Sequence, residues 1–264
     1  MYLGASGGRT AALEQYGTLK GMALPLLNFP FGLLGSLAVL LMPEITQAHI
    51  EGQTARLNAL LDRMLRLTGY FSMLAGTLFW VWGRPLAQLL YHSPEAGFYL
   101  EILAPAMPLM YLESMVDGAM KGIGEQKAAF RYSVWDAVLR IGGVALLLPR
   151  YGMRGFLAVI LLSSFYTCVA NTGRLLLSSG TGHAFRRWLG APLLAAAAAG
   201  AAGRGVRRAL AGFPAQELVG QLAVLTAGGT VTAIVFLLAA LPLGLWEEVR
   251  AVLRQTKTGK NRGK

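Results

Sequence analysis

Charged residues, cysteine and histidine are all scarce in this sequence. Only 14% of its 264 residues are charged, whereas a soluble globular domain has about 25%. The single cysteine, Cys168, excludes an internal disulfide framework and a cysteine-based metal site within one chain. The three histidines lie in different segments, and no Ser/His/Asp or Cys/His arrangement is visible. We therefore expect no metal site, no cofactor and no enzymatic activity.

Long apolar segments dominate what remains. Hydrophobic residues make up 55% of the chain, and the mean hydropathy is +0.50. A helix needs about 20 apolar residues to cross a hydrocarbon core roughly 30 Å thick. Seven segments reach or approach this length, at 22–42, 66–83, 98–121, 130–149, 155–176, 188–203 and 219–243. They are continuous rather than alternating, which predicts an all-α polytopic membrane protein with about seven transmembrane helices.

These segments divide the chain into three parts. Residues 1–19 form a glycine-rich polar lead, residues 20–246 a transmembrane helical lobe, and residues 247–264 a basic tail. The lead has no basic start running into an apolar stretch, so we do not interpret it as a cleavable signal peptide. A polar start on the outer side usually follows an earlier span. We therefore expect this sequence to be the second part of a longer protein.

The formal charge of +11 would suggest a nucleic-acid partner in a soluble protein. Here the basic residues lie between the spans, so we expect a lipid bilayer as partner and no nucleic acid. More of them fall in one alternate set of gaps, together with the tail, than in the other set. The positive-inside rule then places the N-terminus outside and the C-terminus in the cytoplasm.

The first span contains Pro25 and Pro30, with Asn28 between them. A proline inside a helix removes a hydrogen bond and clashes with the preceding turn. The pair therefore predicts a kinked or unwound segment. Broken helices in membranes occur where the backbone lines a cavity or is covered by protein, so Asn28 is a candidate cavity residue. A simple kink remains the alternative.

An amphipathic pattern precedes the second span. Its apolar residues follow helical spacing, at Leu57, Leu60, Leu61, Met64 and Leu65. The segment is either an interfacial helix or a plain extension of the second span. At the other end of that span, Trp80, Trp82 and Tyr91 fit an outer aromatic belt.

Three charged residues share one face of the span 98–121. Glu113, Asp117 and Lys121 are each four residues apart, which places them on one helix stripe. The neighbouring stripe carries small residues, at Ser114, Gly118 and Gly122, and such spacing lets another helix approach closely.

Asp136 and Arg140 form a second charged pair inside the span 130–149. Isolated charges at the bilayer centre cost roughly 2.5 to 17 kcal/mol, so they face a bundle interior or a wet cavity. Arg140 can pair with Asp136 along the helix or reach Glu113 or Asp117 across the interface. The functional interpretation is a cavity that binds a polar or anionic group, because arginine suits bidentate contact with phosphate. The alternative is an internal salt bridge that fixes helix packing.

Two stretches carry a family resemblance. Residues 16–52, YGTLKGMALPLLNFPFGLLGSLAVLLMPEITQAHIEG, and residues 120–155, MKGIGEQKAAFRYSVWDAVLRIGGVALLLPRYGMRG, resemble the multidrug/oligosaccharidyl-lipid/polysaccharide flippase superfamily. The similarity is to its polysaccharide-exporter branch, of the stage V sporulation protein B type. Beyond about residue 156 only hydropathy matches.

The resemblance implies one lobe of a fourteen-helix, two-lobed MATE-like transporter of the bacterial plasma membrane. Residues 16–264 would correspond to helices eight to fourteen, so a separate seven-helix N-terminal lobe is an implied partner. The implied function is translocation of a lipid-linked sugar precursor, with its diphosphate attracted to Arg140 and to the cytoplasmic bases Lys121, Lys127 and Arg131. The alternatives are a cation-coupled drug antiporter using Asp117 or Asp136, and a truncated chain that does not transport and either serves as an assembly subunit or has no function. A role in sporulation is implied by the resemblance alone.

Overall fold

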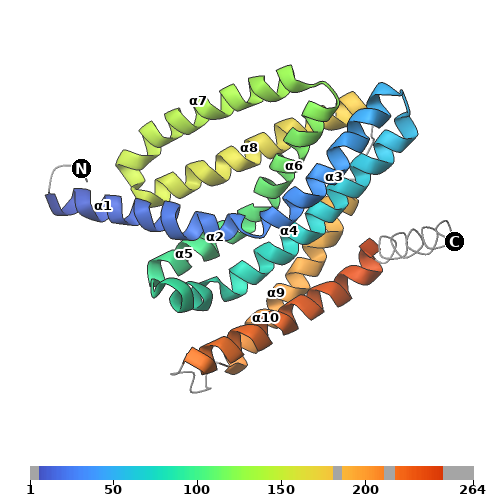
Figure 1. The fold of residues 1–264 in the computed structure, drawn as a ribbon. Coiled ribbons are helices and arrows are strands. Elements are labelled where there is room, and N and C mark those ends of the chain that lie inside the picture. The colour runs from blue at the N-terminus through green and yellow to red at the C-terminus, as the bar shows by residue number, and fades with distance from the viewer. Residues whose placement is uncertain (1–5, 181–185, 211–217, 246–264) are drawn as a thin grey trace.

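Every regular element of the described chain is helical. The structure is a computed structural model that describes residues 6–180, 186–210 and 218–245 (Figure 1). The elements are α1 (Ser6–Thr18), η1 (Leu19–Ala23), α2 (Leu24–Asn28), α3 (Phe31–Ile50), α4 (Thr54–Tyr91), α5 (Pro94–Leu103), η2 (Ala104–Ala106), α6 (Met107–Gly122), α7 (Gln126–Tyr151), α8 (Met153–Ser179), η3 (Arg186–Gly190), α9 (Ala191–Leu210), α10 (Leu218–Ala240) and η4 (Leu241–Leu245). The expected tail at 247–264 lies outside the described residues.

Within the described chain, five helices are long and apolar enough to cross a membrane. They are Phe31–Ile50, Gln126–Tyr151, Met153–Ser179, Trp188–Leu210 and Val219–Leu243. The predicted all-α polytopic class is therefore confirmed. The two other expected segments take different forms: 66–83 lies inside the much longer α4, and 98–121 is divided among α5, η2 and α6.

Helix α4 is the centre of the bundle. It has 38 residues, which makes it about 57 Å long, and it contacts α3, α5, α6, α9 and α10. The apolar stripe at its start is buried in the core, at Leu57, Leu61, Met64 and Leu65. The amphipathic segment is thus an extension of the helix that carries the second span, and its apolar face packs inside the protein.

The segment 98–121 breaks at a short 3-10 turn, η2. Pro105 lies within this turn, and Pro108 follows in the first turn of α6. On the facing side, a Cβ at Gly76 of α4 would lie only 2.9 Å from the carbonyl oxygen of Ala104. A glycine at this place therefore lets the broken segment lie directly against α4.

The first apolar segment is also broken. A π-helical turn, η1, leads into the short α2, and Phe29 and Pro30 form a turn before α3 begins. The Tyr111 hydroxyl of α6 donates a hydrogen bond to the Leu27 carbonyl at this break. A neighbouring helix thus satisfies a backbone group at the interruption, as a low-dielectric surrounding requires.

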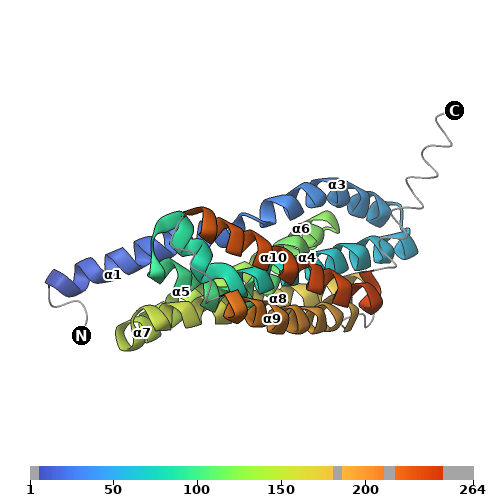
Figure 2. The same cartoon turned by 90° about the horizontal axis from the view of Figure 1, so that it is seen from below.

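Two helix pairs lie on opposite sides of α4. The pair α7–α8 is joined to it through α6, and the pair α9–α10 packs on it directly (Figures 1 and 2).

Small residues on α6 permit a close contact with α3: Gly118 and Gly122 of α6 face Met42 and Thr46 of α3. The predicted close approach of a helix to the small-residue stripe is therefore confirmed.

Candidate functional site

Polar side chains gather where α6, α7 and α8 meet. On α8, Ser163, Thr167 and Asn171 follow one another at intervals of four and so share one helix stripe. All three are buried, with at most 3% of each residue exposed. This stripe supplies the contribution of α8 to a polar junction between the three helices.

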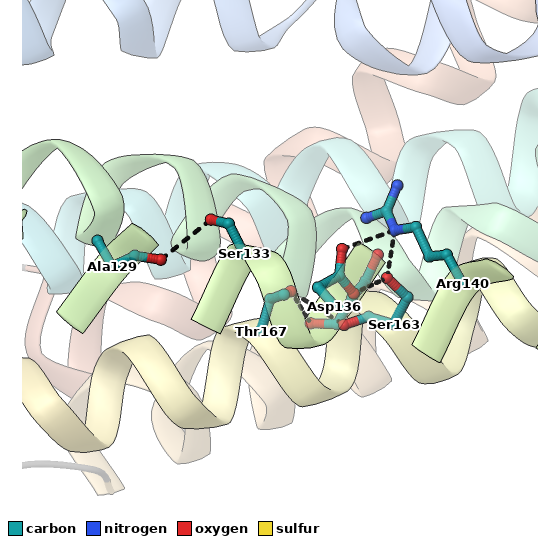
Figure 3. A network of polar contacts seen from close by, with 7 residues as sticks. Ala129, Ser133, Asp136, Arg140, Ser163 and Thr167 are labelled. Atoms are coloured by element: carbon teal, nitrogen blue, oxygen red, sulfur yellow. Dashed lines mark hydrogen bonds and ion pairs between the residues drawn. The ribbon is translucent and has the colours of Figure 1, made fainter. Parts of the chain in front are cut away.

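Asp136, Arg140 and Ser163 form a closed network at this junction (Figure 3). The Arg140 Nε lies 2.7 Å from Asp136 Oδ2 and 2.6 Å from Ser163 Oγ. The Ser163 hydroxyl in turn donates to Asp136 Oδ1. Arg140 thus pairs with Asp136 along α7, and the serine ties both residues to α8.

The two members of the ion pair differ in exposure. The Asp136 side chain is 11% exposed, whereas that of Arg140 is 51% exposed. Only Nε of Arg140 takes part in the contacts with Asp136 and Ser163, and in Figure 3 no dashed line ends on the two outer nitrogens. The network therefore fixes a guanidinium whose outer edge can meet another group.

A cavity of about 320 Å³ opens beside this network. It is lined from α6, α7 and α8 by Glu113, Ser114, Asp117, Lys121, Gln126, Ala129, Phe130, Ser133 and Asn171. Lys121 Nζ lies 2.6 Å from Asp117 Oδ2, so one of the two carboxylates is already neutralised. The cavity is thus a mainly polar space with a local excess of acidic groups.

Glu113 lies between the cavity and the network. It lines the cavity, and it interacts with the Thr167 hydroxyl and with the charges of Arg140 and Asp136. The sequence-predicted residues Glu113, Asp117, Lys121, Asp136 and Arg140 are therefore brought together along one polar seam.

The turn that leads into α7 is clamped to α8. Arg174 Nη2 lies 2.8 Å from Glu125 Oε1, its Nε lies 3.1 Å from Oε2, and the Ser178 hydroxyl donates to Oε1 at 2.9 Å. The Ser178 hydrogen bond and the Arg174 guanidinium hold the pKa of Glu125 below its usual range. This clamp lies at the end of the polar seam, next to Gln126 in the wall of the cavity.

Other predicted site residues lie apart from the seam. Asn28 is exposed at the end of α2, and Pro25 and Pro30 flank it near the helix interruption. Lys127 is exposed near the start of α7, and Arg131 stacks over the Tyr132 ring at 5.7 Å. None of these five residues lines the cavity.

The sequence interpretation missed Ser163, Thr167, Asn171 and the Glu125 clamp. The signal for the first three was a polar residue at every fourth position of an otherwise apolar span. Within the residues that the structure describes, no group of three or more His, Cys, Asp or Glu side chains could hold a metal ion. Cys168 is a buried free thiol.

The fold and the polar seam define a class of protein. Apolar helices of spanning length carry ionisable side chains, and these form ion pairs with one another. Intramembrane ionisable groups of this kind mark pathways for polar solutes. The chain is a multi-pass helical membrane protein.

Comparison with known proteins narrows the class. Residues 20–146 match the MatE family. The chain is 29% identical over 170 residues to the sporulation protein YkvU of Bacillus subtilis (strain 168), a match that covers 64% of this chain and 36% of YkvU. It is 25% identical over 140 residues to stage V sporulation protein B of the same organism, covering 53% of this chain and 27% of that protein. The match thus assigns residues 20–146 to a MatE domain, and the chain spans about a third of the length of the curated relatives it matches.

Proposed function

We propose that this chain is the C-terminal lobe of a flippase that moves a lipid-linked sugar precursor across the bacterial plasma membrane. The MatE match supports a transporter, and the similarity to stage V sporulation protein B agrees with the branch that the sequence resembles. The matched segments cover about a third of these relatives, so the activity of a whole transporter is part of the proposal.

One observation carries the assignment of the substrate class: the Arg140 guanidinium is fixed through Nε, and its outer edge stays open. A planar guanidinium can donate two parallel hydrogen bonds to a phosphate. The diphosphate of the precursor is the group that fits it. Lys127 and Arg131 attract the same anion toward the cytoplasmic side of the lobe, while the lipid tail stays in the bilayer. Lys121, the third base expected there, is already paired with Asp117.

Alternating access requires two lobes, so the proposal includes a seven-helix N-terminal lobe as partner. It also includes an outside N-terminus and a cytoplasmic C-terminus, which the distribution of basic residues supports. Co-purification of a seven-helix membrane protein with the tagged chain tests the partner. Labelling of single cysteines placed at Gly17 and at the α6–α7 turn with an impermeant maleimide tests the orientation.

The test of the function compares Arg140→Ala with Arg150→Ala, a second arginine on the same helix. The purified chain, together with any co-purifying lobe, is placed in proteoliposomes that contain a fluorescent lipid-linked sugar diphosphate. Arg140→Ala is expected to weaken binding and slow translocation at least about tenfold, the loss of one charge-assisted contact. Arg150→Ala is expected to retain both. Unchanged translocation by a folded Arg140→Ala variant would remove Arg140 from the mechanism.

The alternatives receive less support. Asp117 and Asp136 both lie against cationic partners, at 2.6 Å from Lys121 and 2.7 Å from Arg140, which disfavours either as an open proton or sodium site. Dependence of transport on a sodium or proton gradient would favour the antiporter. Failure of any partner lobe to co-purify, with no precursor bound, would favour a chain that serves only in assembly.

A further inference from the structure

The cavity beside the Arg140 network has a polar group without a partner. Asn171 lines it and is only 3% exposed, and its Oδ1 has no hydrogen-bond partner among the described residues. A buried polar atom that makes no hydrogen bond costs free energy unless something else satisfies it. The Asn171 carboxamide can turn about its last bond, so either its oxygen or its nitrogen can meet a ligand.

We propose that this α6–α7–α8 cavity is a subsite for one uncharged sugar ring, with Asn171 as the residue that hydrogen-bonds the ring hydroxyls. The inference rests on the proposed function, because it assigns a place to the sugar that follows the diphosphate. It also makes a claim about this cavity that binding of a soluble sugar tests separately.

The charge of the lining argues against an anion in the cavity. Glu113 and Asp117 both contribute carboxylates, and Lys121 is already paired with Asp117 at 2.6 Å. A phosphate here would be repelled by the Glu113 carboxylate in the cavity wall. The diphosphate therefore belongs at Arg140 and not in the cavity.

The same lining argues against a bare cation. The Lys121 ammonium lies in the wall of the cavity and would repel a metal ion. In the part of the chain that the structure describes, no set of three or more His, Cys, Asp or Glu side chains is arranged for a metal. An uncharged ligand avoids both repulsions.

The size and chemistry of the cavity suit one sugar ring. At about 30 Å³ per water, a volume of about 320 Å³ holds roughly ten water molecules, comparable to the heavy atoms of a single hexose. Carboxylates accept hydrogen bonds from hydroxyl groups, while serine hydroxyls and carboxamides both donate and accept them. Phe130 adds an apolar wall for the C–H face of a ring.

The distance to Arg140 also fits. Ser133 lines the cavity and Arg140 lies seven residues later on α7, which is about 10 Å along a helix. A diphosphate at Arg140 would therefore place the first sugar near the cavity. The two sites together bind one precursor, with its diphosphate at the Arg140 guanidinium and its uncharged sugar ring beside Asn171.

The test uses protection of a cysteine in the cavity wall. Ser114→Cys is made in a Cys168→Ala background of the full chain, purified in detergent, and its rate of alkylation by a maleimide is measured. The probes are glucose, galactose, N-acetylglucosamine and N-acetylgalactosamine, with sodium chloride and sodium pyrophosphate as the ionic competitors. Ser36→Cys, on α3 and outside the cavity lining, is the control.

At least one of the four sugars is expected to slow alkylation of Ser114→Cys with a saturable dependence, and none is expected to affect Ser36→Cys. Adding Asn171→Ala should raise the half-protecting sugar concentration about tenfold, the factor for the loss of one hydrogen bond. Thermal unfolding of each variant confirms that it is folded. Protection by none of the sugars, or protection by sodium or pyrophosphate instead, would overturn the subsite.

Two combinations of experimental results distinguish this inference from the proposed function. If Arg140→Ala abolishes binding of the lipid-linked diphosphate while no sugar protects Ser114→Cys, the function stands and the subsite is wrong. If sugars protect in an Asn171-dependent manner while the lipid-linked diphosphate never binds, the subsite stands and the flippase assignment is wrong.

Discussion

The helix pairs α7–α8 and α9–α10 are both long, apolar and antiparallel neighbours in the chain, but one of them carries an additional set of polar contacts. Glycines bring the helices of both pairs close, at Gly143 against Val159 in the pair α7–α8. The pair α7–α8 adds the Asp136–Arg140–Ser163 network and the Glu125–Arg174 clamp. On the α9–α10 side, two glycines make the close contacts. Gly203 of α9 meets Thr232 of α10, and Gly228 of α10 faces the Trp82 ring of α4.

Burial within the protein differs more within each pair than between the pairs. In their most apolar stretches, 6% of α7 and 39% of α8 are buried, against 28% of the helix at 188–210 and 17% of the helix at 219–243. Because α7 is so little covered, its contacts with α8 are its main attachment. Arg140, which is proposed to meet the substrate, lies among these contacts.

The largest effect is expected at the close contact between α9 and α10. A Cβ at Gly203 would lie 2.6 Å from Thr232 Oγ1 and 3.2 Å from Val81 Cγ1. Gly203→Leu should therefore overpack the α9–α10 interface and lower the unfolding free energy by about 3 kcal/mol. The measurement is the midpoint of unfolding in detergent.

The control for this variant is Gly205→Leu, two residues later on the same helix. No atom outside the local helix lies within 4 Å of a Cβ built there. It is expected to unfold at or above the wild-type midpoint, since leucine is the better helix former. Equal losses for the two variants would show that close packing does not hold this side.

The polar side should respond to the loss of one charge. Asp136→Ala leaves Arg140 and the Ser163 hydroxyl without the carboxylate between them. Breaking a buried pair costs about 3–5 kcal/mol, and the half-exposed arginine reduces the expected loss here to about 2 kcal/mol. The double variant Asp136→Ala/Arg140→Ala should recover about half of it. Strictly additive losses would mean that the pair does not act as a unit.

A smaller effect is expected at the contact between α4 and α10. Trp82 Nε1 donates to Thr232 Oγ1 at 3.0 Å, and the Thr232 hydroxyl also donates to the Gly228 carbonyl at 2.8 Å. Trp82→Phe removes one hydrogen bond and keeps the other, so the loss should be about 1 kcal/mol. Trp135→Phe, at an exposed position on α7, is the control and should leave the unfolding midpoint unchanged.

The smallest effect is the pH dependence of the Glu125 clamp. Because the Ser178 hydrogen bond and the Arg174 charge lower the pKa of this carboxylate, its contribution is present above the ordinary value of 4.5 and is lost as the pH falls through the lower folded value. Wild type should therefore unfold at a higher temperature than Glu125→Gln near neutral pH, and the two curves should converge below pH 4.5. Glu44→Gln controls for the removal of an exposed carboxylate. A difference that persists at the acidic end would rule out the linkage.

Hydropathy could predict where most helices lie because a long apolar segment has few alternatives in a bilayer. It could not predict where one helix ends and the next begins. The segments around 54–66 and 84–91 are polar enough to suggest gaps, yet α4 runs through both and past Pro85. The polar residues of these segments tolerate water, and their apolar stripe can pack on other helices. Whether such a segment forms a gap or continues the helix therefore depends on which helices lie next to it.

Single residues show the same limit. Trp82 was expected in an aromatic belt, but it is 4% exposed and bonded to Thr232, so that interpretation was wrong for this residue. A helix pattern does not say which side of a tryptophan meets another helix. The acidic and basic members of the polar seam were found from their charge. Ser163 and Asn171 carry none, and their importance depends on which helix faces them.

The interruption at Phe29 and Pro30 is tied to α6 by the Tyr111 hydroxyl, which donates to the Leu27 carbonyl. Tyr111 stands two residues before Glu113, which lines the cavity. Any displacement of the Leu27 carbonyl must therefore either break this hydrogen bond or move the part of α6 that carries Glu113. The backbone break near the N-terminus is thus connected through α6 to the wall of the cavity.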